Sequence, residues 1–302
     1  MIDIRKSLCL LATLAIVFSC SDDNNSPEQQ GGSSSKNENR NIVNTQKAVA
    51  GLEFPRLKGG NNKLIVHENN DGYGVNYSVE WDCDKKSQRW SCYFLTTKNK
   101  KSNTSRYYGD PQYPFDPALT ADEYWPADYY YGSGFDHGHI CPSNDRLYSS
   151  TANYQTFFLT NMQPQYKAFN GSDPAHKYKG LWINMENFVH NVRLSESDTL
   201  FVCKGGTIDS EEHILSRIQG KLIVPKYFFA AILLKHSTGY RSLGFWFEHS
   251  PVYHGDDPLS GYTVSIDELE KRTGIDFFCN LPDDIEAKTE SSYSLVSWGN
   301  LD

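Results

Sequence analysis

Two histidines, an aspartate, an arginine and a cysteine fall within the twelve residues FDHGHICPSNDR, at positions 135–146. If residues 136–139 form a strand, His137 and His139 project from the same face, because side chains alternate along a strand. Three interpretations are open. The pair could bind zinc with Cys141 as a third ligand, one histidine could act as a general base while its neighbours orient it or bind substrate, or both could lie in an exposed hairpin without a chemical role.

Two side chains that offer oxygen ligands follow downstream. Asn170 ends the segment TNMQPQYKAFN (160–170), and Glu186 lies in LWINMEN (181–187). Mg²⁺ prefers oxygen ligands, keeps several waters and often takes only one or two groups from the protein. An ion held by Asn170 and waters, with Glu186 gripping one water, could neutralise a phosphodiester while His139 activates the attacking water. Taken singly, Asn170 is also typical of an Asn-Gly turn and Glu186 of a solvated helix, so the prediction depends on their combination.

The N-terminus predicts export. Arg5 and Lys6 precede an apolar run over residues 8–18, which is short for a membrane-spanning helix but suits the core of a secretory signal peptide. The run ends in VFSC, which resembles a bacterial lipobox with Cys20 as the lipidated residue, and the acidic SDD that follows resembles export signals of surface-displayed lipoproteins. We therefore expect a signal peptide over residues 1–19 and an exported protein that is lipid-anchored to a membrane through Cys20.

Composition divides the rest of the chain into a tether and one domain. Residues 20–50 contain almost no apolar side chain before Ile42, so they are expected to form a flexible, low-complexity tether. Residues 51–302 are rich in aromatic side chains, contain no internal repeat and have a size that a single core can support. The net charge of −8 argues against a surface that attracts polyanions throughout, so a nucleic-acid partner would need a local basic site and a metal ion.

The domain carries an odd number of cysteines. In an exported chain these residues can oxidise, and the odd number leaves at least one thiol unpaired. Cys83 and Cys92 flank the turn DKKSQ between two strand-like runs and could bridge a hairpin, while five reduced thiols are the alternative. The five are Cys83, Cys92, Cys141, Cys203 and Cys279.

Most of the domain reads as strands. The short apolar run over residues 154–162 could be a further buried strand, whereas residues 105–134, with four prolines and many tyrosines, form a long loop of the kind that is usually functional. We expect most of these tyrosines to pack onto the core. The predicted fold class is α+β, a central antiparallel β-sheet with packed helices. The strand-like runs cover residues 63–83, 89–97, 198–206, 221–235 and 240–249.

Three segments predict helices. In residues 180–194, Trp182, Glu186 and His190 are each four apart and therefore lie along one face. Ser265 and Glu268 form a capping box that starts a second helix, and Gly274 ends it, while Pro282 suits the first turn of a third. A neighbouring apolar face of the first helix is formed by Leu181, Met185, Phe188 and Val189.

The chain resembles the DNA/RNA non-specific endonuclease family, the sugar-non-specific nucleases that have a ββα-metal finger. Members carry an Asp-Arg-Gly-His motif, an Asn-Met-x-Pro-Gln segment, an Asn-x-Gly-type turn and a Trp-x-x-x-Glu helix. Here these motifs stand in the same order as DHGH (136–139), NMQPQ (161–165), FNG (169–171) and WINME (182–186), and SRYYGDP (105–111) is similar to the upstream segment that supplies an arginine. The resemblance runs from about residue 60 to residue 290.

The resemblance implies a role for each matched position. His139 would be the general base, Asn170 the only direct protein ligand of Mg²⁺ (with Mn²⁺ as a substitute), Glu186 the holder of a metal-bound water, and Arg106 a contact to the phosphate or leaving group. Asn161 would be a support behind the metal ligand or a structural turn residue. The implied substrates are single- and double-stranded DNA and RNA, cut without strong sequence preference to leave 5′-phosphates.

Two positions depart from the family pattern. The arginine of the Asp-Arg-Gly-His motif is His137 here, and the position four after Glu186, often arginine in the family, is His190. Histidine is charged only below roughly neutral pH and offers fewer donors than arginine. We assign Asp136, His137 and His190 to substrate binding. The weaker charge leaves an alternative open, a surface lipoprotein that binds nucleic acid with little catalytic activity.

Overall fold

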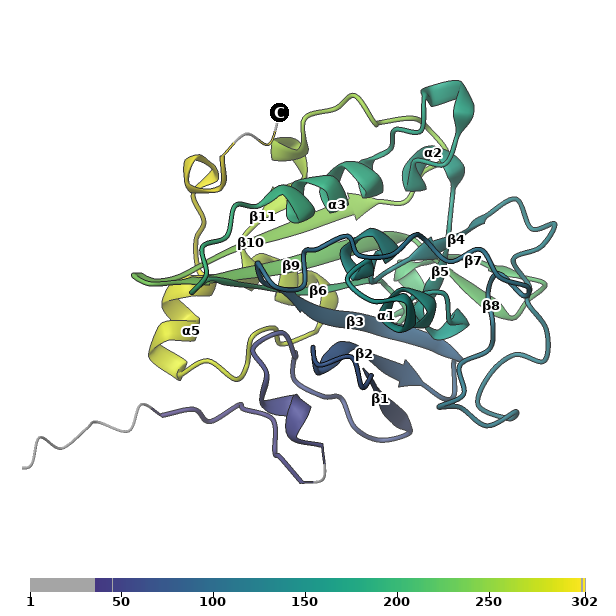
Figure 1. Cartoon of the computed structure of the whole chain (residues 1–302). Coiled ribbons are helices and arrows are strands. Elements are labelled where there is room, and N and C mark those ends of the chain that lie inside the picture. The colour runs from purple at the N-terminus through teal and green to yellow at the C-terminus, as the bar shows by residue number, and fades with distance from the viewer. Residues whose placement is uncertain (1–35, 45, 300, 302) are drawn as a thin grey trace, which may run out of the picture. The chain divides into compact units, whose positions relative to one another are not determined.

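The computed structural model describes residues 36–44, 46–299 and 301, so the predicted signal peptide and Cys20 lie outside the described residues. Its largest element is a seven-stranded sheet with the order β1-β2-β3-β6-β9-β10-β11 (Figure 1), in which every pair of neighbours is antiparallel. The strands are β1 (Asn62–Glu68), β2 (Val75–Asp82), β3 (Ser87–Leu95), β6 (Thr199–Gly206), β9 (Tyr227–His236), β10 (Gly239–Glu248) and β11 (Thr263–Val264).

Both faces of this sheet are buried, which explains why its central strand is a nearly continuous apolar run. In β9, Phe228 and Ile232 face one core, and Phe229 and Leu233 face the other. Each of these side chains is at most 1% exposed. A strand covered on one side only would alternate apolar and polar residues. The continuous apolar sequence FFAAILL is therefore typical of a strand that is covered on both faces.

Helices form these two layers. The α3 helix contributes Leu181, Met185 and Val189 to the first core, as its apolar spacing predicts, while Ile266 and Leu269 of α4 belong to the second. Figure 1 shows α3 and α5 on opposite sides of the sheet. The helices are α1 (Ser150–Gln155), α2 (Lys167–Asn170), α3 (Leu181–Asn191), α4 (Ile266–Thr273) and α5 (Asp283–Glu290).

Two small hairpins lie outside the main sheet. In one, β4 (Asp136–His139) pairs with β5 (Met162–Gln165), and in the other β7 (Ile214–Ile218) pairs with β8 (Leu222–Pro225). The α+β class with a central antiparallel sheet is confirmed.

Two strand predictions differ from the structure. Residues 154–162 cover the end of α1 and a 3-10 turn, and only Met162 belongs to a strand. A short buried apolar run does not separate strand from helix by its pattern, and here Ser149 starts α1 by accepting a hydrogen bond from the Ala152 amide. The run 221–235 is divided between β8 and β9, because the chain leaves the small hairpin at Pro225 and enters the main sheet at Tyr227.

The described residues at the end of the predicted tether, 36–44 and 46–50, belong to the compact part of the chain. Asn39 donates hydrogen bonds to Asp276 and Glu286, and Val49 is buried in the second core. Polar composition led to the prediction of a flexible tether, but the Asn39 side chain is held by hydrogen bonds to Asp276 and to Glu286 of α5. No helix in the described ranges is long and apolar enough to cross a membrane.

All five domain cysteines are free thiols, so of the two alternatives the structure has the reduced thiols and no bridge between Cys83 and Cys92. Cys83 lies in the turn after β2, whereas Cys92 lies inside β3 opposite Ser78 on one side and Cys203 on the other. The two cysteines are therefore not opposite each other in the hairpin, and their separation along the chain does not reveal this.

Candidate active site

The β4–β5 hairpin places the histidine motif in a closely packed position. Gly138 is required there, because a Cβ atom at this residue would lie 2.3 Å from the side chain of Gln165 on β5. The buried side chain of Asn161, the residue before β5, binds the backbone of Cys141, which follows β4. It accepts a hydrogen bond from the Cys141 amide and donates one to the Cys141 carbonyl, both at 2.8 Å. Asn161 thus has a structural role, and it fixes the backbone two residues after His139.

His139 has the properties of a general base. Its Nε2 atom is buried and has no hydrogen-bond partner among the described residues. Burial, followed by the positive charge of Arg106, lowers the pKa of His139 well below its usual value. The imidazole is therefore neutral at neutral pH and can accept a proton.

The α3 helix contacts β4 through a hydrogen bond to the backbone of His139. The Trp182 indole donates a hydrogen bond of 2.9 Å to the His139 carbonyl. One helical turn later, Glu186 Oε1 lies 2.8 Å from Nζ of Lys204, a fully buried lysine on β6. Burial raises the pKa of Glu186, and the Lys204 charge opposes that rise. The lysine thereby favours the ionised carboxylate that a water-holding role requires.

Asn170 is positioned through Asp136. The Asn170 amide nitrogen donates to Asp136 Oδ2 at 3.0 Å, and the Ser172 hydroxyl donates to the same oxygen. In the described part of the chain the Asn170 oxygen has no hydrogen-bond donor, so it is available as a hard ligand. Asp136, which we predicted to bind substrate, thus holds the side chain of the predicted metal ligand in place.

Arg106 is exposed on the loop that precedes β4. Its guanidinium donates to the Ser143 hydroxyl and lies 4.7 Å from the ring centroid of Phe157. Its charge acts on both His139 and Glu186. An exposed guanidinium near both groups suits a contact to phosphate.

His137 is less accessible than its predicted role in substrate binding requires. Its side chain is 9% exposed, and its Nε2 lies 2.8 Å from an Asp128 carboxylate oxygen. The ring is stacked between Tyr113 and Tyr130, at centroid distances of 3.7 and 4.2 Å. A ring that is enclosed on both faces and already paired with a carboxylate through Nε2 is poorly placed to bind phosphate. His137 instead connects the motif to the tyrosine-rich loop.

His190 is also engaged by a carboxylate. Its Nδ1 lies 2.7 Å from Asp145 Oδ1, and its side chain remains 29% exposed. Asp145 itself is buried and accepts a further hydrogen bond from the Tyr93 hydroxyl. His190 therefore keeps one accessible edge on the same face of α3 as Glu186, which is compatible with substrate contact.

The zinc interpretation of the histidine pair has no support. Among the described residues, no third histidine, cysteine or carboxylate lies close enough to His137 and His139 to complete a metal site. Cys141 is buried, and burial raises the pKa of its thiol to about 12, so it stays protonated and is a poor ligand.

Sequence reasoning missed Lys204, Asp128 and Asp145. Lys204 had a local signal, since it is the one charged residue in the otherwise apolar strand run LFVCKGG. The two aspartates had none, because each meets its histidine partner only through the tertiary fold.

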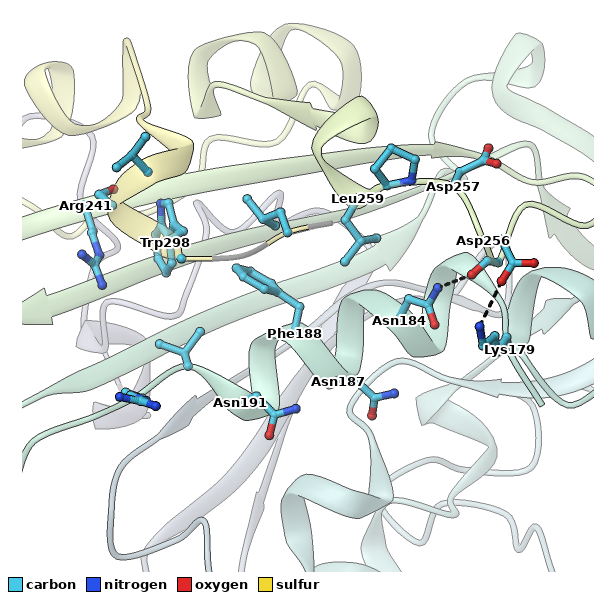
Figure 2. A pocket seen from close by; sticks show the side chains of 18 residues that line it. Lys179, Asn184, Asn187, Phe188, Asn191, Arg241, Asp256, Asp257, Leu259 and Trp298 are labelled. Atoms are coloured by element: carbon cyan, nitrogen blue, oxygen red, sulfur yellow. Dashed lines mark hydrogen bonds and ion pairs between the residues drawn. The ribbon is translucent and has the colours of Figure 1, made fainter. Parts of the chain in front are cut away.

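The opposite side of α3 lines a different feature, a surface groove of about 1050 Å³. Figure 2 shows Asn184, Asn187 and Asn191 along this groove. Their spacing along α3 places them on the side of the helix away from Glu186. At one end Lys179 lies 3.0 Å from Asp256. Lys179 is thus already paired, and the residues that line the groove do not include the two histidines of the site.

A family model described as DNA/RNA non-specific endonuclease matches residues 62–284. The chain belongs to this family. The resemblance in the motifs is thereby confirmed, and the protein is a nuclease that hydrolyses phosphodiester bonds of nucleic acids and, like its family, depends on a metal.

Individual relatives agree. The nuclease is 28% identical over 229 residues to a nuclease of Nostoc sp., with 71% of this chain and 75% of that protein covered. It is 27% identical to nuclease C1 of Cunninghamella echinulata, with 68% and 81% covered. It is 26% identical to human mitochondrial endonuclease G over 160 residues, about half of each chain. A crystal structure of the EndoG/EndoGI complex shares the fold, with a TM-score of 0.55, 19% identity, and 72% and 86% covered.

His249 binds the backbone just before the helix that carries Asn170, and its buried imidazole is expected to make the stability of the fold depend on pH. Its Nε2 accepts a hydrogen bond of 2.8 Å from the Tyr166 amide, directly before the helix that ends in Asn170, and its Nδ1 bonds the Pro225 carbonyl. Burial lowers the pKa of His249 from 6.5 to about 4.

Because the folded pKa of His249 is depressed, the unfolded chain takes up the proton first, and stability is lost as pH falls from about 6.5 to 4. The expected loss is roughly 3 kcal/mol. Urea unfolding at a series of pH values checks this. His249→Gln should show less acid sensitivity in this window, and an unchanged pH dependence in that variant would contradict the assignment.

Proposed function

We propose that this nuclease uses Mg²⁺, accepts Mn²⁺ as a substitute, and cuts both DNA and RNA without strong sequence preference to leave 5′-phosphates. The observation that carries the proposal is that β4 bears His139, whose buried Nε2 has no partner among the described residues, while Asp136 of the same strand binds the Asn170 amide nitrogen and leaves its oxygen free. The residues fit a hydrated magnesium ion, because they offer one hard oxygen ligand and a carboxylate nearby.

Each side chain has a defined part in the proposed reaction. When bound, Mg²⁺ supplies positive charge that neutralises the phosphodiester. Asn170 would hold the ion through its amide oxygen, and Glu186, kept ionised by Lys204, would accept a hydrogen bond from one of the ion's waters. His139 would take the proton of the attacking water at Nε2, and Arg106 would bind the phosphate.

Conversion of supercoiled plasmid tests the activity. After chelation of divalent ions the protein should be inactive, and Mg²⁺ or Mn²⁺ should restore nicking of plasmid DNA and cleavage of an RNA of mixed sequence, whereas Zn²⁺ should not. End analysis of the products should find phosphate at the 5′ side. Binding without cleavage under every metal condition would favour the alternative of a nucleic-acid-binding lipoprotein.

We also propose that the nuclease is exported, lipid-anchored to a bacterial membrane through Cys20, and exposed at the cell surface. The support is the lipobox-like VFSC, the apolar run before it and the polar segment after it. Cells that express the full chain should incorporate labelled palmitate into it and retain it in the membrane fraction. Cys20→Ser should abolish the label and release the protein, and equal labelling of both forms would contradict the proposal.

A further inference from the structure

Three carboxylates converge on the face of the sheet opposite α3. Asp267 and Glu270 come from α4 and Glu290 from the end of α5, and one oxygen atom from each lies within 4.8 Å of the others. Two helices that are distant from the histidine site thus bring three negative charges together. None of these residues has a part in the proposed nuclease reaction.

No cation balances these charges in the described part of the chain. Asp267, Glu270 and Glu290 form no ion pair with lysine, arginine or histidine there. The other charges that act on Glu290 are also acidic, since Asp276 and Glu286 raise its pKa in the same direction as Glu270. Asp276 and Glu286 both accept hydrogen bonds from the Asn39 amide.

Glu290 points independently to a ligand at the cluster. Its side chain belongs to a residue that is only 4% exposed, and its Oε1 is buried without a hydrogen-bond partner among the described residues. A buried carboxylate oxygen without a donor is costly. Glu270, by comparison, has one oxygen satisfied by the Phe277 amide at 2.7 Å.

The cluster is electrostatically unstable when it is fully ionised. Burial, followed by the neighbouring carboxylates, raises the pKa of Glu290 to about 10. Burial also raises the pKa of Glu270 to about 8, with the Phe277 amide opposing the rise and acidic neighbours adding to it. Either protons or a bound cation must relieve this repulsion near neutral pH.

We propose that Asp267, Glu270 and Glu290 bind a calcium ion that holds α4 to α5. The donors are oxygen atoms only, which excludes a preference for zinc. Ca²⁺ lies at 2.3–2.6 Å from its ligands, so oxygens up to about 4.8 Å apart fit one ion, whereas Mg²⁺ at 2.0–2.1 Å needs a tighter set and takes fewer carboxylates. The ion would satisfy the free Glu290 oxygen and remove the repulsion.

Calcium binding and unfolding of the purified protein, at pH 8 after chelation, test this site. We expect one equivalent of Ca²⁺ with a Kd on the order of 10⁻⁴ to 10⁻³ M. At 10 mM Ca²⁺ the unfolding equilibrium constant should fall by about 10- to 100-fold, and 10 mM Mg²⁺ should do much less. Asn170→Ala, which removes the predicted nuclease metal ligand, should show the same calcium response, so that the two metal sites are distinguished.

We expect Glu290→Gln to change the stability of the fold in opposite directions with and without Ca²⁺. Glu290→Gln removes one repelling charge, so without Ca²⁺ it should be at least as stable as the wild type, and with Ca²⁺ it should be less stable. Asp267 is exposed, so Asp267→Asn should still fold. It should weaken calcium binding at least tenfold, and it tests the site even if Glu290→Gln does not fold. Asp284→Asn, an exposed acidic position of α5 outside the cluster, should respond like the wild type.

Three results would overturn the proposal. One is a wild type that Ca²⁺ does not stabilise at pH 8 but acidification does, since protons would then occupy the cluster. Another is an equal calcium response in wild type, Asp267→Asn and Glu290→Gln. The third is equal stabilisation by Mg²⁺ and Ca²⁺. None of these depends on whether the protein cuts nucleic acid.

Discussion

Replacing His139 by alanine is expected to lower the kcat for plasmid nicking by about 10²- to 10⁴-fold, the usual contribution of a positioned general base. The imidazole is buried and neutral, and its Nε2 has no partner in the described part of the chain, so it is free to accept the proton of the attacking water. Since we propose that the residue contacts the reacting water and not the bulk of the substrate, KM should change little. Steady-state nicking at saturating Mg²⁺ measures both constants.

His176→Ala is the matched control for this prediction. That histidine lies between α2 and α3, where its side chain is 36% exposed and paired with Asp173. It should retain wild-type activity. If His139→Ala kept more than about a tenth of the wild-type rate while it remained folded, His139 would not be the general base.

Replacing Lys204 by methionine is expected to have the largest effect on stability. The change keeps most of the side-chain volume but leaves the Glu186 carboxylate without its cation, 2.8 Å away. Removal of one partner from a buried ion pair costs about 3 kcal/mol or more. The pKa of Glu186, already raised by burial, should rise further without Lys204. Activity should therefore fall by roughly 10- to 100-fold, as for other partners of metal-site ligands, with the acidic limb of the pH–rate profile moved to higher pH.

Two further variants separate the pair from a general packing effect. The double variant Lys204→Met with Glu186→Gln should recover much of the stability, because no charge is then left alone, but it should not recover activity. Lys235→Met, an exposed lysine on the adjacent strand β9, should leave both properties unchanged. A shift of the pH–rate profile in Lys235→Met, or none in Lys204→Met, would contradict the role of Lys204.

The parts of the site that were predictable from sequence are those with a local pattern. The alternation in Asp136–His139 placed its two histidines on a strand, and the spacing of Leu181, Met185 and Val189 placed Glu186 on the polar side of a helix. These patterns are dictated by the geometry of a single element, so they survive folding unchanged.

The remaining parts depended on contacts between distant segments. His137 was predicted to replace an arginine at the phosphate, but Asp128 and the two flanking tyrosines reach it from a loop without regular structure. His190 likewise meets Asp145 from another element. No periodicity or spacing encodes where such loop residues lie, so carboxylate partners were not foreseen.

The most direct test of the central claim is an anomalous-difference map from crystals of the His139→Ala variant that contain Mn²⁺ and a short oligonucleotide. The account predicts one peak bonded to Asn170 Oδ1 and otherwise to water and phosphate oxygens, with Glu186 in contact with a bound water and position 139 facing the scissile phosphate from the other side. A peak coordinated by His137, or no manganese within bonding distance of Asn170, would contradict it.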